Sequence, residues 1–137
     1  MSNLDKTIRQ LERIDLNAKS WDSGLIKGID KYINQPIKLL DIEGLRLLIG
    51  QNIGLDYLIP LAIDKLKENV LAEGDLYAGD LFKNVLDCNK QFWIQHKDYY
   101  QIVVDLYIDN ISVFESDNAY RQIRKSFELF NDLRDVV

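Results

Sequence analysis

Apolar side chains recur every three or four residues along most of the chain, which is the spacing of amphipathic helices. The pattern predicts helices over residues 3–13, 22–34, 42–51, 55–69, from 81 onward, 98–114 and 117–132, with a short apolar segment at Phe92-Trp93. Isoleucine and valine raise the strand propensity of residues 98–114, but the spacing favours helix there as well. No stretch alternates cleanly between apolar and polar residues. The predicted fold class is therefore all-α, a single compact irregular bundle of about six or seven helices.

Polar residues and proline mark the expected helix ends. The expected N-caps are Ser2 or Asn3, Asp22 or Ser23, Asp41, Asp80, and Ser116 or Asp117. Pro36 should stop the helix before it, because the residue preceding a proline is driven out of the helical conformation. Between helices 42–51 and 55–69, either Asn52 or Gly54 should supply a left-handed residue. We expect these two helices to pack as a hairpin at the heart of the fold.

Residues 70–80 lose the helical spacing and carry glycines and acids instead. Gly74 and Gly79 permit bends in the backbone, and the acids Glu73, Asp75 and Asp80 lie close to them in the sequence. This composition predicts an ordered loop that ends where Asp80 caps the next helix.

The composition is typical of a soluble globular protein. The chain has 137 residues, of which 47% are hydrophobic and 28% charged, so residues 1–137 are expected to form one domain around one core. The N-terminal residues lack the basic segment and apolar run of a secretory signal, and no stretch is apolar for long enough to span a membrane. We therefore expect a cytoplasmic protein. Cys88 is the only cysteine and cannot form an internal disulfide.

Negative charge is concentrated in the middle of the chain. The formal net charge is −5, yet residues 68–117 hold ten acids against three lysines. Such a surface disfavours nucleic acid as a direct partner, because phosphate binding needs lysine and arginine. It would suit a basic protein partner. The alternative is a solvated acidic face that only keeps the domain soluble.

Candidate catalytic and metal-binding groups are sparse. The only histidine, His96, has polar neighbours and no accompanying nucleophile signature, so we interpret it as a surface residue. Glu73, Asp75 and Asp80 could supply oxygen ligands to calcium or magnesium, but the twelve-residue pattern of an EF-hand is missing. The alternative is that Asp75 and Asp80 accept amide hydrogens of the loop or of the following helix.

Arg46 has two interpretations that the sequence leaves open. It can lie on a helix surface, where its long aliphatic stem covers neighbouring side chains. It can also pair with Asp75 or Asp80 and so anchor the loop to the helical hairpin, because buried arginine is rare without a carboxylate partner.

Four segments carry a resemblance to a known family. They are residues 45–55, residues 57–62, residues 73–81 and Phe92-Trp93, with looser similarity over residues 11–36. Within them, the signature residues are Leu45, Arg46, Gly50, Gln51, Gly54, Pro60, Gly74, Gly79 and Asp80. Together these segments resemble a family of immunity proteins from bacterial contact-dependent growth inhibition (CDI) systems.

The resemblance implies a small bacterial cytoplasmic protein that binds the toxic C-terminal domain of a cognate CDI toxin and neutralises it. Protection in this family is by stoichiometric binding, so the resemblance implies no enzymatic activity, no cofactor, no metal, no small-molecule substrate and no membrane partner. Such toxins are commonly nucleases with basic substrate surfaces, to which an acidic inhibitor is complementary.

We expect the signature to serve the scaffold and the exposed acids to contact the toxin, because partner specificity requires variation on a shared scaffold. The expected core residues are Leu45, Leu48, Ile49, Leu58, Pro60 and Leu61, with turns shaped by Gly50, Gly54, Gly74 and Gly79. The expected toxin contacts are Asp56, Glu73, Asp75, Tyr77 and Asp87, with Asp98, Asp105 and Asp109 as a second patch.

Two other functional classes fit the sequence less well. One is a helical adaptor that uses the same acidic surface on a different protein. The other is a small enzyme with dispersed carboxylates, in which Asp75 and Asp80 would support metal-dependent hydrolysis.

Overall fold

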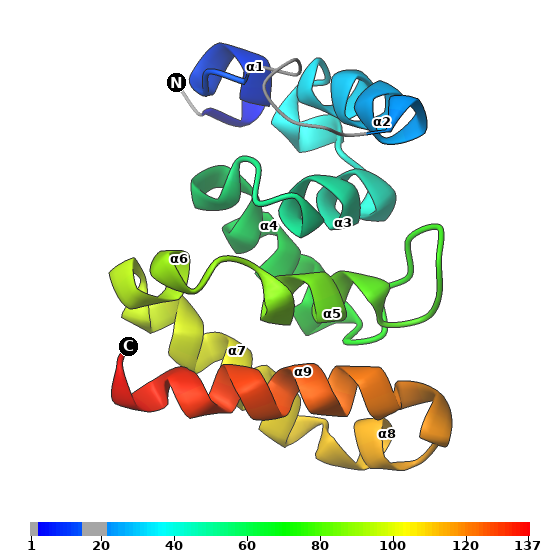
Figure 1. The fold of residues 1–137 in the computed structure, drawn as a ribbon, viewed down its shortest axis with the longest axis vertical. Coiled ribbons are helices and arrows are strands. Elements are labelled where there is room, and N and C mark those ends of the chain that lie inside the picture. Colours follow the sequence, from blue (N-terminus) through cyan, green and yellow to red (C-terminus); the bar gives the residue numbers. More distant parts are fainter. Residues whose placement is uncertain (1–2, 15–21) are drawn as a thin grey trace.

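The computed structural model describes residues 3–14 and 22–137, and over these residues the protein is all-α (Figure 1). Its α-helices are α1 Ile8–Leu11, α2 Ser23–Ile33, α3 Ile42–Gly50, α4 Leu55–Glu68, α5 Asp80–Asp87, α6 Lys90–Gln95, α7 Lys97–Asp109, α8 Ile111–Glu115 and α9 Arg121–Asn131. Short 3-10 helices are η1 Asn3–Asp5, η2 Ile37–Leu39, η3 Asn118–Tyr120 and η4 Asp132–Asp135. The predicted fold class is confirmed, and six of the described α-helices have seven residues or more.

The prediction of one helix over residues 3–13 is wrong. Thr7 interrupts it, because its side chain accepts the amide hydrogen of Gln10 while the Gln10 side chain accepts that of Thr7, a reciprocal cap that starts α1. Thr7 also pairs with Pro36 in an isolated antiparallel bridge, and the adjacent Lys6 carbonyl accepts from Ile37 at 2.9 Å. The contacts with Pro36 and Ile37 join residues that are distant in sequence, so helical spacing could not reveal them. The proposed cap Ser2 lies outside the described residues.

The helices form a stack in which the chain runs from α1 at one end of the long axis to α8 at the other, and α9 then returns between α5 and α8 (Figure 1). Helices α2, α3, α5 and α9 form one row in which each packs on the next, and all four begin on the same side of the stack. Helix α4 packs against α3, α5 and α7. No helix in the described part of the chain is long and apolar enough to cross a bilayer.

The predicted hairpin of α3 and α4 is confirmed at the centre of the stack. Its connection uses two left-handed residues, Asn52 with φ 58° and Gly54 with φ 68°. A Cβ at Gly54 would lie 2.7 Å from the Ile8 side chain, so this glycine also lets α1 pack closely. The predicted core residues Leu45, Leu48, Ile49 and Leu58 are buried, whereas Pro60 and Leu61 are only half-buried.

Aromatic rings join the last helices to the rest of the stack. Phe82 of α5 meets Tyr107 and Phe114 edge-on, with ring centroids 6.4 and 5.4 Å apart. Tyr107 in turn stacks on Phe127 of α9 at 3.7 Å. Residues 98–114 are helical rather than extended, as predicted, but they form two helices that are divided at Asn110, whose side chain donates to the Leu106 carbonyl at 2.8 Å. One core therefore runs through the stack to α9.

Candidate functional site

Residues 70–79 form the loop between α4 and α5, and we name this segment the acidic loop. It stands out from the side of the stack on which α3, α5 and α9 begin (Figure 1). Glu73 and Ala78 form an isolated antiparallel bridge across the loop. Residues 74–77 are therefore its tip. The prediction of an ordered loop here is confirmed.

All four backbone amides of the tip donate hydrogen bonds to two carboxylates. The amide of Gly74 donates to Oδ1 of Asp80 at 2.7 Å. The amides of Leu76 and Tyr77 donate to Oδ2 of Asp80 at 3.0 and 3.3 Å. The amide of Asp75 donates to Oε1 of Glu43 at 2.8 Å. Because every amide in the tip has an anchor, the backbone of the tip has one defined path.

Arg46 supplies the positive charge between these two carboxylates. Its Nε and Nη2 donate to the two carboxylate oxygens of Glu43 at 2.6 Å each, a bidentate pair, and Nε lies 3.8 Å from Oδ2 of Asp80. The side chains of Arg46, Glu43 and Asp80 are 12%, 13% and 1% exposed. Of the two interpretations of Arg46, the structure supports the anchoring one, with the unpredicted Glu43 as the hydrogen-bonded partner and Asp80 as a more distant ionic partner.

Pairing of Glu43 with Arg46 shifts the pKa of both side chains. The hydrogen bond from Arg46 lowers the pKa of Glu43 below its ordinary value, against the opposing effect of burial. The hydrogen bond to Glu43 raises the pKa of Arg46 further. Both groups are therefore charged at neutral pH, as a bidentate ion pair requires.

The prediction that Asp80 caps the next helix is wrong. Asp80 is the first residue of α5, and the capping position belongs to Gly79, whose φ of 90° is in the left-handed region. The turn at Gly79 directs the Asp80 carboxylate back toward the loop, where it accepts amide hydrogens of the tip. A Cβ at Gly79 would also lie 2.6 Å from Ile123 of α9.

Two further glycines permit close approach in this region. A Cβ at Gly74 would lie 2.6 Å from Oε1 of Glu43, so glycine lets the loop reach the ion pair. A Cβ at Gly50 would lie 2.6 Å from Nδ2 of Asn84, the atom that donates to the Arg46 carbonyl at 2.8 Å. Gly50 and Gly74 thus allow α3, α5 and the acidic loop to approach one another closely.

Side chains at positions 73 and 75–77 of the acidic loop face solvent. Glu73 and Asp75 are exposed, and beside them Leu76 and Tyr77 are 63% and 40% exposed. Partial burial of the Tyr77 ring raises the pKa of its hydroxyl. Residues 73–77 therefore display two acids and the adjacent side chains of Leu76 and Tyr77 to solvent.

The structure does not bring all eight predicted contact residues together, although all eight are exposed. Glu73, Asp75 and Tyr77 share the acidic loop. Asp87 lies at the end of α5, where Lys83 pairs with it at 2.5 Å. Asp105 and Asp109 of α7 line a hollow of about 320 Å³ together with Lys67, Ile102 and Leu106. Asp98 lies in the first turn of α7.

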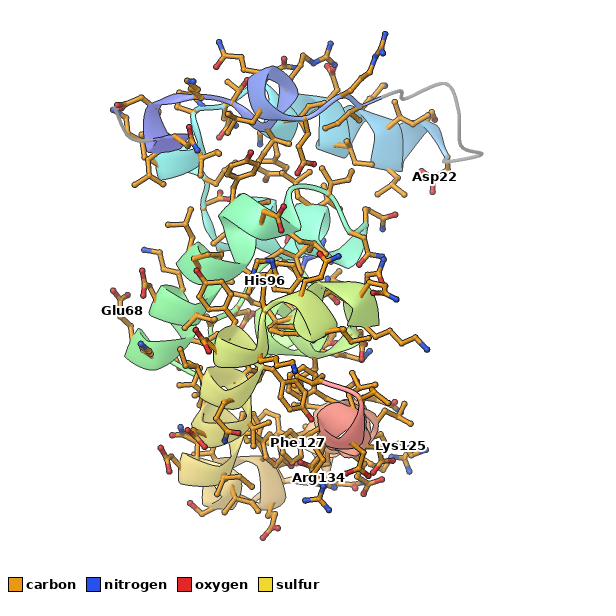
Figure 2. All side chains as sticks on the ribbon, turned by 90° about the vertical axis from the view of Figure 1, so that its left-hand side faces the viewer. Asp22, Glu68, His96, Lys125, Phe127 and Arg134 are labelled. Carbon is orange, nitrogen blue, oxygen red and sulfur yellow. The ribbon has the colours of Figure 1, made fainter. Side chains whose placement is uncertain are left out.

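Asp56 lies at a different place again, beside His96. The two side chains are 3.3 Å apart. The imidazole is stacked on Phe92, with ring centroids 4.3 Å apart, and lies near Tyr99 at 5.6 Å. The turn that carries His96 is on the side of the stack opposite the acidic loop, and Figure 2 views this side. His96 is therefore half-buried against aromatic rings and not a free surface histidine.

The alternative chemistries of the sequence have little structural basis. Within residues 3–14 and 22–137, no group of three or more His, Cys, Asp or Glu side chains is arranged to hold a metal ion. The Asp80 carboxylate, a proposed ligand, is instead surrounded by amide donors. Cys88 is buried, and burial raises the pKa of its thiol to about 12, which makes it a poor nucleophile.

Sequence reasoning missed Glu43 and Leu76. Glu43 had a readable signal, because it lies three residues before Arg46 on a predicted helix, where opposite charges meet. Leu76 also had one, since it is a large apolar residue in the middle of a polar loop. Neither signal shows the direction in which the side chain points.

Comparison with known proteins bears out the resemblance. The family model described as CDI immunity proteins matches residues 4–103, which include the acidic loop and its anchors. No curated protein and no solved structure matches the chain. Proteins of the matched family are non-enzymatic inhibitors that neutralise a cognate CDI toxin.

Proposed function

We propose that this chain, which belongs to the family of CDI immunity proteins, neutralises its cognate toxin by stoichiometric binding of the toxin's C-terminal domain through the acidic loop. We further propose that this occurs in the bacterial cytoplasm. The observation that carries the proposal is the attachment of all four tip amides to Asp80 and Glu43.

The anchored backbone favours the acidic loop over the other acidic places on the surface. A loop that is already in one conformation loses little entropy when it binds a partner. The Glu43–Arg46–Asp80 cluster provides this order, while Glu73 and Asp75 remain exposed on the loop. Fixed, exposed negative charge on a protruding segment is suited to a basic concave surface.

We propose that the toxin domain is a nuclease whose substrate surface is basic. The acids of the loop would then occupy the place of substrate phosphates, and their charge would speed association. Incubation of the cognate toxin domain with DNA and RNA tests this part of the proposal. A toxin domain that leaves both intact would refute the nuclease assignment without affecting the binding assignment.

Charge reversal in the loop tests the binding assignment. The double variant Glu73→Lys/Asp75→Lys should associate with catalytically inactivated toxin domain at least ~10-fold more slowly at low salt, because electrostatic steering acts mainly on the association rate. The difference between variant and wild type should shrink as salt is raised. Stopped-flow or surface-based kinetics over a salt series would measure it.

A matched control reverses the same amount of charge elsewhere. Glu115 and Glu128 are exposed on α8 and α9, which are elements outside the acidic loop. Glu115→Lys/Glu128→Lys changes the net charge by the same amount, so it separates a local effect from a global one. Equal slowing by both double variants would contradict the assignment to the acidic loop, as would no slowing by either.

A further inference from the structure

We infer that Leu76 and Tyr77 are the apolar anchors of the toxin contact, and that they fit an apolar pocket rimmed by lysine or arginine on the toxin domain. The inference rests on the proposed function and adds the chemistry of the partner surface. Such anchors would slow dissociation of the complex, which the surface acids alone do not do, because surface charge affects the association rate more than the lifetime of the complex.

The fold uses the backbone of both residues, whereas most of the Leu76 side chain and part of the Tyr77 ring remain in solvent. Their amides donate to the buried carboxylate of Asp80, which fixes the position of both Cα atoms. Leu76 nevertheless exposes 63% of its surface and Tyr77 exposes 40%. The exposed apolar surface of these two side chains is not buried in the core, so its burial is available to a partner.

The neighbours of this pair specify the rim of the partner pocket. Glu73 and Asp75 lie within three residues of Leu76 and are exposed on the same loop. Interfaces place apolar and aromatic side chains at the centre and charged side chains at the rim, and tyrosine is enriched among the residues that dominate binding energy. The complementary surface therefore has an apolar centre and a basic edge.

Rigid presentation makes these side chains effective anchors. The four anchored amides hold the tip before the partner arrives, so binding immobilises only a few side-chain torsions. Arg46, Glu43 and Asp80 thereby act as positioning residues, since their own side chains are nearly buried and do not reach the partner.

Other exposed apolar residues provide matched controls. Leu39 of η2 is 64% exposed and Leu129 of α9 is 71% exposed, so each is at least as accessible as Leu76. Each lies on a different element from the acidic loop and has no anchored acidic tip around it. Truncation of these residues removes the same kind of side chain from the surface without touching the loop.

The experiment measures the dissociation of full-length variants from catalytically inactivated cognate toxin domain. Leu76→Ala and Tyr77→Ala should each dissociate at least ~10-fold faster than wild type with association rates within ~3-fold, because loss of a buried anchor acts on residence time. Leu39→Ala and Leu129→Ala should dissociate at the wild-type rate. Leu76→Gln, which keeps the length of the side chain, should behave as Leu76→Ala does.

The outcomes separate this inference from the proposed function. Tight binding by wild type with unchanged dissociation of the Leu76 and Tyr77 variants would overturn the anchors and leave the acidic loop assignment standing. Equal acceleration by Leu39→Ala would also overturn them. Failure of folded wild-type protein to bind the toxin domain would overturn both. Thermal unfolding of each variant at the wild-type temperature would show that lost binding is not lost folding.

Discussion

At the scale of single residues, the properties of the acidic loop are determined by one buried side chain, Asp80, and two part-buried ones, Glu43 and Arg46. Glu43 and Asp80 present two carboxylates to one guanidinium, so Arg46 alone does not balance them. The four tip amides direct their positive ends at the same carboxylates and offset the remaining negative charge. The cluster is thus satisfied only when the loop is in place, since a buried carboxylate without donors is costly.

The shifted pKa of Glu43 predicts how stability depends on pH. Because Arg46 lowers the pKa of Glu43 below 4.5, the unfolded chain binds a proton at this carboxyl more readily than the folded protein does. The stabilisation is therefore complete above about pH 4.5 and is lost as the pH falls through the folded pKa. The difference in free energy of unfolding between wild type and Glu43→Gln should shrink between pH 7 and pH 3.

Urea unfolding of both proteins across this pH range would check the prediction. Glutamine keeps the shape of the side chain but cannot titrate, so the difference between the two curves isolates the Glu43 carboxyl. A difference that stays constant with pH would show that Arg46 does not favour the charged form in the folded protein.

At the scale of elements, Asp80 attaches the loop to α5 and Glu43 attaches it to α3. Asp80→Ala should expose the amides of Gly74, Leu76 and Tyr77 to solvent exchange, because all three lose their acceptor. Loss of an acceptor worth about 2 kcal/mol corresponds to roughly 30-fold faster exchange. The amide of Asp75 should keep more protection, since its acceptor is Glu43.

Hydrogen exchange measured residue by residue by NMR would check the effect of Asp80→Ala. The internal comparison with Asp75 makes the result specific to the Asp80 acceptor. Uniform loss of protection over residues 74–77 would instead indicate that the whole loop unfolds as one unit.

Helix positions were predictable from the sequence because they depend on local spacing. Helices α2, α3 and α4 begin and end within one residue of their predicted limits. The side chain of Asp80 was not predictable in the same way. Its direction depends on the left-handed turn at Gly79 and on the contact between Gly79 and Ile123 of α9, which are far apart in sequence. For the same reason, the sequence could not separate Asp75 from Asp80 as the partner of Arg46.

At the scale of the whole molecule, the core extends beyond the segment that the family model matches. The match ends at residue 103, inside α7, whereas buried aromatic residues continue into α8 and α9. Ile123 of α9 packs where a Cβ of Gly79 would lie, so α9 also supports the turn that orients Asp80. The last helices are therefore part of the structure that holds the acidic loop.

Two substitutions in α9 test how tightly this helix packs on the stack. Phe127→Ala should lower the free energy of unfolding by about 3 kcal/mol, because it removes a buried ring that stacks on Tyr107. Leu129→Ala, two residues away and exposed, should change it by less than about 0.5 kcal/mol. Urea unfolding of both variants would measure the difference. Equal effects would show that α9 packs on the stack less tightly than its burial indicates.

The residues that fix the backbone of the tip lie outside it, so they are different from the residues whose side chains are proposed to contact the toxin. Glu43 and Asp80 accept the hydrogen bonds of the tip amides, and Arg46 pairs with these two carboxylates. The side chains at positions 75–77 can therefore be substituted with little effect on the stability of the residues that anchor the loop. A lineage that alters only these three positions could track a changing toxin without having to evolve a new fold.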